Sequence, residues 1–163
     1  MNPLPINARE KVCQHVDAIF GSGVSNALPL DLQFEFSRRT GRIKNFCIGG
    51  KLAATLRTDG GLALTIFGAQ YFLDNNDSNR QFHQNCVIPV TEVLPFVSEG
   101  RSLFCKHVKW CGCNIKIRSD VAIIDDNDRV IAVGVAMLSH KLMRLYDRGV
   151  AIKCREGIKG RID

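Results

Sequence analysis

The chain has 163 residues, 45% of them hydrophobic, which suffices for an ordinary buried core and excludes a chain that is disordered throughout. Its 22 lysine and arginine residues outnumber its 16 aspartate and glutamate residues, so the formal charge is +6 and an anionic partner is favoured. The sequence has neither a run of about 18 apolar residues that could cross a bilayer nor, at residues 1–5, the basic and apolar regions of a secretion signal, and we therefore expect a cytoplasmic protein without membrane contacts.

Residues 8–20 are predicted to form the first helix. Val12, Val16 and Phe20 recur at helical spacing and would share one face, whereas most charged residues of this stretch lie elsewhere. Asn7 stands where a helix cap is expected, and Gly21 can end the helix by adopting a positive φ.

Four short strands are predicted next. Apolar and polar side chains alternate from Leu32 to Phe36, which is typical of a strand with one buried face. Three further strands are predicted between turns that each contain glycine, at residues 43–48, 51–57 and 62–66, and residues 68–73 are predicted to form a short helix. Residues 1–73 are therefore expected to form an α+β domain.

Residues 74–84 are polar and almost devoid of apolar side chains, as an interdomain linker must be if it is to stay solvated. We place the domain boundary there and assign residues 85–163 to a second domain that ends in a basic tail.

The second domain is predicted to consist of many short strands. A strand at 86–89 would lead into a helix at 91–99 capped by Thr91, followed by strands at 102–108, 115–117, 121–124 and 130–136. Ser139 would cap a last helix that Gly149 ends, and residues 150–153 would form the closing strand. Short strands that close on themselves predict a small barrel.

Several motifs, in a consistent order, carry a resemblance to a known family. In the first half they are Phe34 to Ile43, Gly50 to Arg57, and Leu64-Thr65-Ile66 followed by Gly68-Ala69. In the second half they are Val87-Ile88-Pro89, Gly100 to Phe104, Val121 to Asp125, Ala132 to Ala136 with Leu138-Ser139, and Arg148 to Lys153. With these motifs, residues 32–155 resemble the C-terminal domains of archaeal (archaeosine) tRNA-guanine transglycosylase, the last of which is a PUA domain. The resemblance implies an α+β fold, in which an α+β domain with a helix and an antiparallel strand meander precedes a small PUA-type pseudo-barrel of mostly antiparallel strands, and it implies binding to RNA.

The sequence departs from the family in two ways. Ser119-Asp120 stands where the family usually has glycine-aspartate, so the turn before the long hairpin is expected to be reshaped. The chain is also too short to include the catalytic barrel of a transglycosylase, and it has no phosphate-binding glycine loop, nucleophile elbow or spaced carboxylate pair. We therefore expect a protein that is not an enzyme and that needs no cofactor.

The resemblance implies that two turns, at Gly100 and Gly149, lie side by side and grip an RNA stem. Glycine would let the RNA backbone approach closely, and the neighbouring arginines would supply positive charge. The residues predicted to bind RNA are Gly100, Arg101, Ser102, Lys106, Arg144, Arg148, Gly149, Lys153 and Arg155, with Lys159 and Arg161 extending the strip. Additional candidates are Arg38, Arg39 and Arg42 at one hairpin tip, although a charged tip also serves to keep strands soluble.

Four potential zinc ligands, Cys105, His107, Cys111 and Cys113, lie within nine residues. Their spacing is unlike that of a zinc knuckle, because one residue rather than two separates the last two cysteines. Alternation along the predicted strand would nevertheless bring Cys105 and His107 to one face.

The seven cysteines, an odd number mostly within apolar segments, are otherwise expected to be reduced thiols.

The leading hypothesis is a non-catalytic protein that recognises tRNA through an acceptor-stem-like duplex, in connection with a tRNA modification such as archaeosine base exchange. A separate catalytic transglycosylase subunit would then carry out the chemistry. One alternative is a ribosome-assembly or translation factor that binds rRNA with the same surface. The other is a small zinc-dependent protein that uses the Cys105 to Cys113 cluster.

Overall fold

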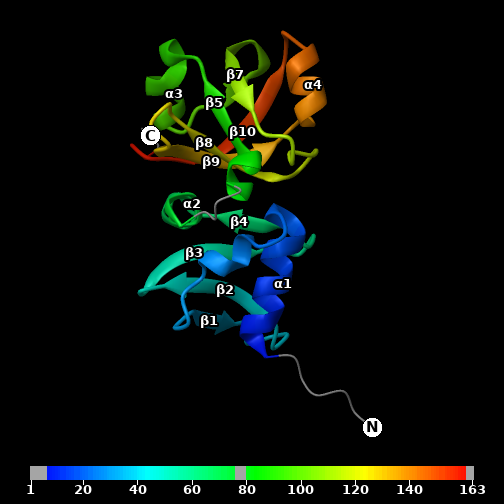
Figure 1. Ribbon diagram of the computed structural model, residues 1–163, viewed down its shortest axis with the longest axis vertical. Helices are drawn as coiled ribbons and strands as arrows, with labels where there is room; N and C mark the ends of the chain where they lie inside the picture. Colours follow the sequence, from blue (N-terminus) through cyan, green and yellow to red (C-terminus); the bar gives the residue numbers. More distant parts are fainter. Residues whose placement is uncertain (1–6, 76–79, 161–163) are drawn as a thin grey trace.

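A computed structural model, shown in Figure 1, describes residues 7–75 and 80–160 of the chain. Two units are stacked along the long axis of the molecule: a four-stranded sheet with helix α1 (Ala8–Phe20) below, and a six-stranded pseudo-barrel above. Helix α2 (Ile66–Asp74) lies between the two units. The α+β fold class expected from the sequence is confirmed.

Helix α1 has the bounds that its periodicity predicts. Asn7 accepts a hydrogen bond from the backbone N–H of Glu10 at 2.8 Å, which satisfies one of the free donors at the start of the helix. The buried face consists of Val12, Val16 and Phe20. The chain then leaves the helix through Gly21, which has a φ of 126°.

The first sheet is an antiparallel meander in the order β1-β2-β3-β4. After the short 3-10 turn η1 (Val24–Ala27), its strands are β1 (Gln33–Phe36), β2 (Ile43–Ile48), β3 (Lys51–Leu56) and β4 (Leu62–Leu64). Helix α2 begins two residues earlier than predicted, because Thr65 caps it by accepting a hydrogen bond from the N–H of Gly68 at 3.0 Å.

The second sheet has the order β6-β10-β9-β8-β5-β7, in which the β5–β8 pair is parallel and the other pairs are antiparallel. Its strands are β5 (Cys86–Pro89), β6 (Leu103–Phe104), β7 (Val108–Cys111), β8 (Asp120–Ile124), β9 (Val130–Ala136) and β10 (Val150–Gly157). The connections include η3 (Thr91–Val93), α3 (Leu94–Ser98), η4 (Cys105–His107) and α4 (His140–Leu145). The sheet curls into the nearly closed, barrel-like form that was expected (Figure 1).

Four predicted elements of this unit differ in the structure, one of which is the last helix, because it ends at Leu145 rather than at Gly149. The strand predicted at 102–108 is broken by η4, because the chain turns a corner there from pairing with β10 to pairing with β5. The strand predicted at 115–117 is wrong: the segment is a loop in which Ile115 is buried and Ile117 is 59% exposed. The helix predicted at 91–99 divides into η3 and α3 beside Pro95, which lacks the N–H needed inside a helix.

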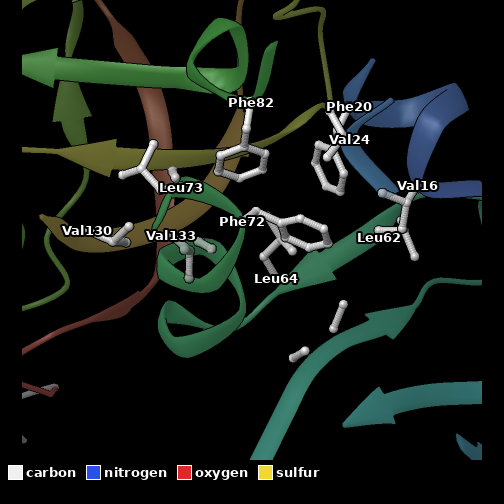
Figure 2. Packing of buried hydrophobic residues seen from close by; sticks show 14 of the residues in the cluster. Val16, Phe20, Val24, Leu62, Leu64, Phe72, Leu73, Phe82, Val130 and Val133 are labelled. Carbon is white, nitrogen blue, oxygen red and sulfur yellow. The ribbon is translucent and has the colours of Figure 1, made fainter. Parts of the chain in front are cut away.

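The two units share one aromatic core, shown in Figure 2. Phe20 of α1, Phe72 of α2 and Phe82 meet with ring centroids 5.4 to 6.1 Å apart. Val130 and Val133 of β9 belong to the same buried cluster, so first-unit and second-unit side chains pack together without an intervening solvent layer. A second cluster fills the inside of the pseudo-barrel itself.

The segment predicted to be a solvated linker takes part in this core. Residues 76–79 lie outside the described residues, but Gln81–Asn85 forms the 3-10 turn η2, and the side chain of Phe82 is fully buried. Because the segment is otherwise polar, its composition did not indicate that Phe82 is buried. The division into domains at 74–84 stays a prediction, whereas the expectation that residues 81–84 are a solvated linker is corrected by the burial of Phe82.

An ion pair between a buried carboxylate and a partly exposed arginine also joins the units. The carboxylate of Asp120 on β8 is fully buried and accepts hydrogen bonds from Nη1 of Arg155 at 2.9 Å and from Nη2 at 3.1 Å. It also accepts one from the backbone N–H of Leu64 on β4 at 2.8 Å. Arg155 in turn donates to the carbonyl of Leu64 at 2.6 Å. Strand β4 of the first unit is thereby fixed to β8 and β10 of the second.

Candidate nucleic-acid interface

The bend before β10 exposes bare backbone beside free cations. Gly149 has a φ of 87°, a conformation that suits glycine, and no atom lies within 4 Å of the place where a side chain would begin. Its carbonyl accepts a hydrogen bond from the N–H of Cys105 at 2.9 Å, which holds the bend against η4. Arg148 and Lys106 are therefore neighbours across this contact, and both are exposed.

Two aromatic side chains stand close to the same bend. Phe104, whose backbone pairs with Val150, is 46% exposed, and Tyr146, at the end of α4, is 52% exposed. Exposed rings of this size offer faces on which unpaired bases can stack. The sequence pointed to the glycine and the cations but not to the two rings, because Phe104 lies in a predicted strand and Tyr146 in a predicted helix, where either side chain could be buried.

The bend at Gly100 lies elsewhere, and the expectation that the two bends are side by side is wrong. Gly100, with a φ of 92°, lies against Gly157 at the far end of β10, where an added side-chain carbon on Gly157 would come within 2.4 Å of the Gly100 nitrogen. The eight residues of β10 separate the two bends, which at about 3.3 Å per residue amounts to roughly 20 Å or more. The antiparallel register of β6 with β10 dictates this separation.

Three predicted RNA-binding arginines have partners within the protein. The guanidinium of Arg101 lies over the ring of Phe96, 5.6 Å from its centroid. Nη2 of Arg144 donates to the carbonyl of Cys111 at 2.9 Å. Arg155 is engaged with Asp120 and Leu64, so its charge is balanced by a buried carboxylate. Among the three, Arg155 is the least available to a ligand.

The remaining predicted residues lie along the β6–β10 pair. Lys153 is exposed on β10, Ser102 is half-buried just before β6, and Lys159 is exposed beyond the end of β10, while Arg161 lies outside the described residues. Lys153 and Lys159 therefore lie on or just beyond β10, the strand that begins after the Gly149 bend. Arg38, Arg39 and Arg42 are exposed in the β1–β2 turn, which belongs to the other unit.

The four potential zinc ligands do not form a common site. Cys105 and His107 lie in η4 rather than on one face of a strand. The thiol of Cys111 is directed to the carbonyl of His140, and that of Cys113 donates to Oε1 of Gln84 at 3.0 Å. Within residues 7–75 and 80–160, no three His, Cys, Asp or Glu side chains are grouped as metal ligands would be.

The cysteines differ sharply in their surroundings. Burial raises the pKa of the Cys154 thiol to about 11, and it also raises the pKa of Cys86 and Cys105. Cys113 is exposed. Alkylation of the native protein with iodoacetamide at pH 8 is therefore expected to modify Cys113 at least about tenfold faster than Cys154. Peptide mass spectrometry over a time course measures both rates, with a Cys113→Ser variant as the control, and equal rates would contradict the expectation.

No helix among the described residues combines the length and the apolar character needed to cross a bilayer.

Two known domain families match parts of this chain. Residues 91–158 match the PUA domain, and residues 15–78 match the patch-forming domain C2 of tRNA-guanine transglycosylase. The two matches follow one another along the chain in the order of the two units.

Individual relatives show which proteins contain a region similar to both units. The tRNA-guanine(15) transglycosylase of Thermoplasma volcanium is 33% identical over 151 residues, which cover 91% of this chain and 23% of the relative. That of Pyrococcus furiosus is 32% identical over 162 residues, covering 93% of this chain and 26% of the relative. The chain thus resembles the C-terminal domains of archaeal tRNA-guanine transglycosylase, as the sequence motifs indicated, and it spans about a quarter of the length of these relatives.

Solved structures share the fold of the whole chain. A hypothetical protein from Pyrococcus horikoshii OT3 superimposes with a TM-score of 0.71 at 18% identity, covering 96% of this chain and 93% of that one. A PUA domain protein from Aeropyrum pernix K1 gives a TM-score of 0.64 at 14% identity, covering 96% and 85%. The stacked arrangement of both units therefore recurs in other proteins.

Proposed function

We propose that this chain is a non-catalytic RNA-binding protein that recognises tRNA in connection with a tRNA modification such as archaeosine base exchange. The observation that carries the proposal is the open bend at Gly149, which follows the exposed Arg148 and contacts Cys105, the residue before the exposed Lys106. The similarity to enzymes whose name specifies tRNA supports tRNA as the class of RNA.

The bend has the features that contact with an RNA backbone requires. Phosphates supply most of the affinity for a cationic surface, and shape and 2′-hydroxyl contacts require close approach to the protein backbone. Gly149 permits that approach because it has no side chain, and the two cations beside it have no ion-pair partner among the described residues. Phe104 and Tyr146 provide stacking surfaces at the margin, which would hold an unpaired base at the end of a duplex.

The role that we propose is positional. A module that binds tRNA without a catalytic group raises the local concentration of the substrate and fixes its register for another active site. We propose that a separate catalytic transglycosylase subunit supplies that active site. Purification of a tagged chain from its native cell, followed by mass spectrometry of the retained proteins, tests this part, and recovery without any transglycosylase would contradict it.

The bend is tested by an Arg148→Ala, Lys106→Ala double variant. Loss of two phosphate contacts is expected to weaken tRNA binding roughly tenfold at moderate salt and to reduce the slope of log K against log salt by about 2. Fluorescence anisotropy with labelled tRNA at several salt concentrations measures both quantities.

The matched control is Arg129→Ala, because Arg129 is also exposed but precedes β9, at the end of the sheet opposite the Gly149 bend. It is expected to leave the affinity within about twofold. If the double variant binds tRNA as well as the native chain does, the bend is not the binding surface. Crosslinking and sequencing of bound RNA in cells separates tRNA from rRNA, and recovery of rRNA alone would favour the ribosome-assembly or translation alternative.

A further inference from the structure

The first unit contains a cleft of about 910 Å³ that is rimmed by positive charge. It lies between the first half of α1, the turn that joins β1 to β2 and the turn that joins β3 to β4. Five lysine and arginine side chains line it, and none of its described lining residues is an aspartate or glutamate. The five are Lys11, Arg39, Arg42, Lys44 and Arg57. A cleft of this volume and sign is suited to a ligand that carries phosphate.

Two of these cations have acidic partners and three have none, within the part of the chain that the structure describes. Lys44 lies 3.8 Å from a carboxylate oxygen of Glu35, and Arg57 lies 3.1 Å from one of Asp59. Lys11, Arg39 and Arg42 form no ion pair within residues 7–75 and 80–160. The protein therefore leaves their charge unbalanced around one shared space.

Beneath the cations the lining is apolar. Phe36, at the end of β1, leaves 52% of its surface exposed, although it is a large aromatic residue. Ile43 and Leu56, both half-buried, continue the apolar surface from β2 and β3. An exposed ring beside unpaired cations is the combination with which proteins bind single-stranded nucleic acid, because the ring stacks on a base while the cations contact the phosphates.

We propose that this cleft is a second RNA-binding site, which takes an unpaired nucleotide segment with a base on Phe36 and its phosphates against Arg39 and Arg42. The inference deepens the proposed function and rests on it, since it assumes that RNA is the partner. An acidic peptide would satisfy the cations but would leave the ring and the apolar lining without a matching group.

The position of the cleft makes it distinct from the Gly149 bend. Strands β1 and β2 lie at the lower end of the long axis in Figure 1, whereas α4 and the start of β10 lie at the upper end. The shared aromatic core fixes the two units to each other. One RNA could therefore place a duplex at the bend and an unpaired stretch in the cleft at the same time.

The experiment uses the full chain and a fluorescein-labelled hexauridylate, which has unpaired bases and no duplex. An Arg39→Glu, Arg42→Glu variant is expected to weaken binding about tenfold and to lower the salt slope by about 1.4, the value for two phosphate contacts on a single strand. Lys51→Glu is the matched control, because Lys51 is exposed in the same unit but does not line the cleft. It is expected to change the affinity less than threefold. Equal losses in both variants would overturn the inference.

Stacking is tested separately at Phe36. Phe36→Leu keeps an apolar side chain but removes the ring, and it is expected to weaken hexauridylate binding about five- to tenfold, whereas Phe36→Trp is expected to retain it. Thermal melting of each variant checks that it is folded. An unchanged affinity in Phe36→Leu, or displacement of hexauridylate by an oligoglutamate of equal charge, would show that only charge is recognised and would overturn the inference.

The same variants distinguish this inference from the proposed function. If tRNA binding depends on Arg148 and Lys106, but the cleft variants bind hexauridylate as tightly as the native chain does, the second site is disproved and the proposed function is retained. If the native chain binds neither RNA, the proposed function fails and the cleft inference fails with it.

Discussion

Replacing Asp120 by alanine is expected to lower the free energy of unfolding by about 2–3 kcal/mol, because it leaves the partly exposed Arg155 without its buried partner. The backbone N–H of Leu64 loses its acceptor at the same time. Urea denaturation followed by circular dichroism measures the change in the midpoint and in the extrapolated free energy.

The cost arises from breaking the pair rather than from a large net gain in forming it. Burial raises the pKa of the Asp120 carboxyl, and the hydrogen bonds from Arg155 only oppose that shift. A double replacement of Asp120 and Arg155 by leucine is therefore expected to cost less than Asp120→Ala alone. Lys109→Ala is a suitable control, since it removes a 3.0 Å ion pair with Asp126 that is half-exposed, and it is expected to cost less than about 1 kcal/mol. A double variant less stable than the single one would contradict the account.

Replacing Phe82 by alanine is expected to cost about 3–5 kcal/mol, because it opens a cavity where the two units meet. The side chain is fully buried, and its ring centroid lies 5.4 Å from that of Phe72 and 5.6 Å from that of Phe20. Since the core is continuous, thermal unfolding monitored at probes in either unit is expected to shift downward by the same amount.

Phe82→Leu provides the graded control, since it preserves most of the apolar volume and is expected to cost less than the alanine variant. His83, next in the chain, is not a suitable control because it contacts Asp128 at 3.2 Å. If Phe82→Ala changed the melting of one unit and left the other unaltered, the two units would have to be energetically independent.

The sequence predicted the elements whose signal is local. Helix α1 and strands β2, β5 and β9 have the bounds that periodicity and turn glycines indicated, because side-chain alternation and capping are properties of neighbouring residues. The strand predicted at 115–117 failed for the same reason: a buried Ile115 followed by an exposed Ile117 imitates alternation within an ordinary loop.

Long-range relations could not be predicted in this way. The residue types of Gly100 and Gly149 were informative, but only the pairing of β6 with β10 shows that they lie at opposite ends of a strand. Arg155 resembled its basic neighbours, and its partner Asp120 is 35 positions away in the chain. The cleft of the first unit combines residues from α1, two hairpin turns and the end of β1, so its unpaired charges and exposed ring become apparent only in three dimensions.

The continuous aromatic core has an evolutionary consequence. A gene fission near residue 82 would separate Phe82 from Phe20 and Phe72, so each product would expose part of the aromatic core to solvent. Exchange of one half alone would therefore be selected against. The two halves are therefore expected to be inherited together as one unit. The alignments with transglycosylases agree with that expectation, since they run through both halves and cover nine-tenths of this chain.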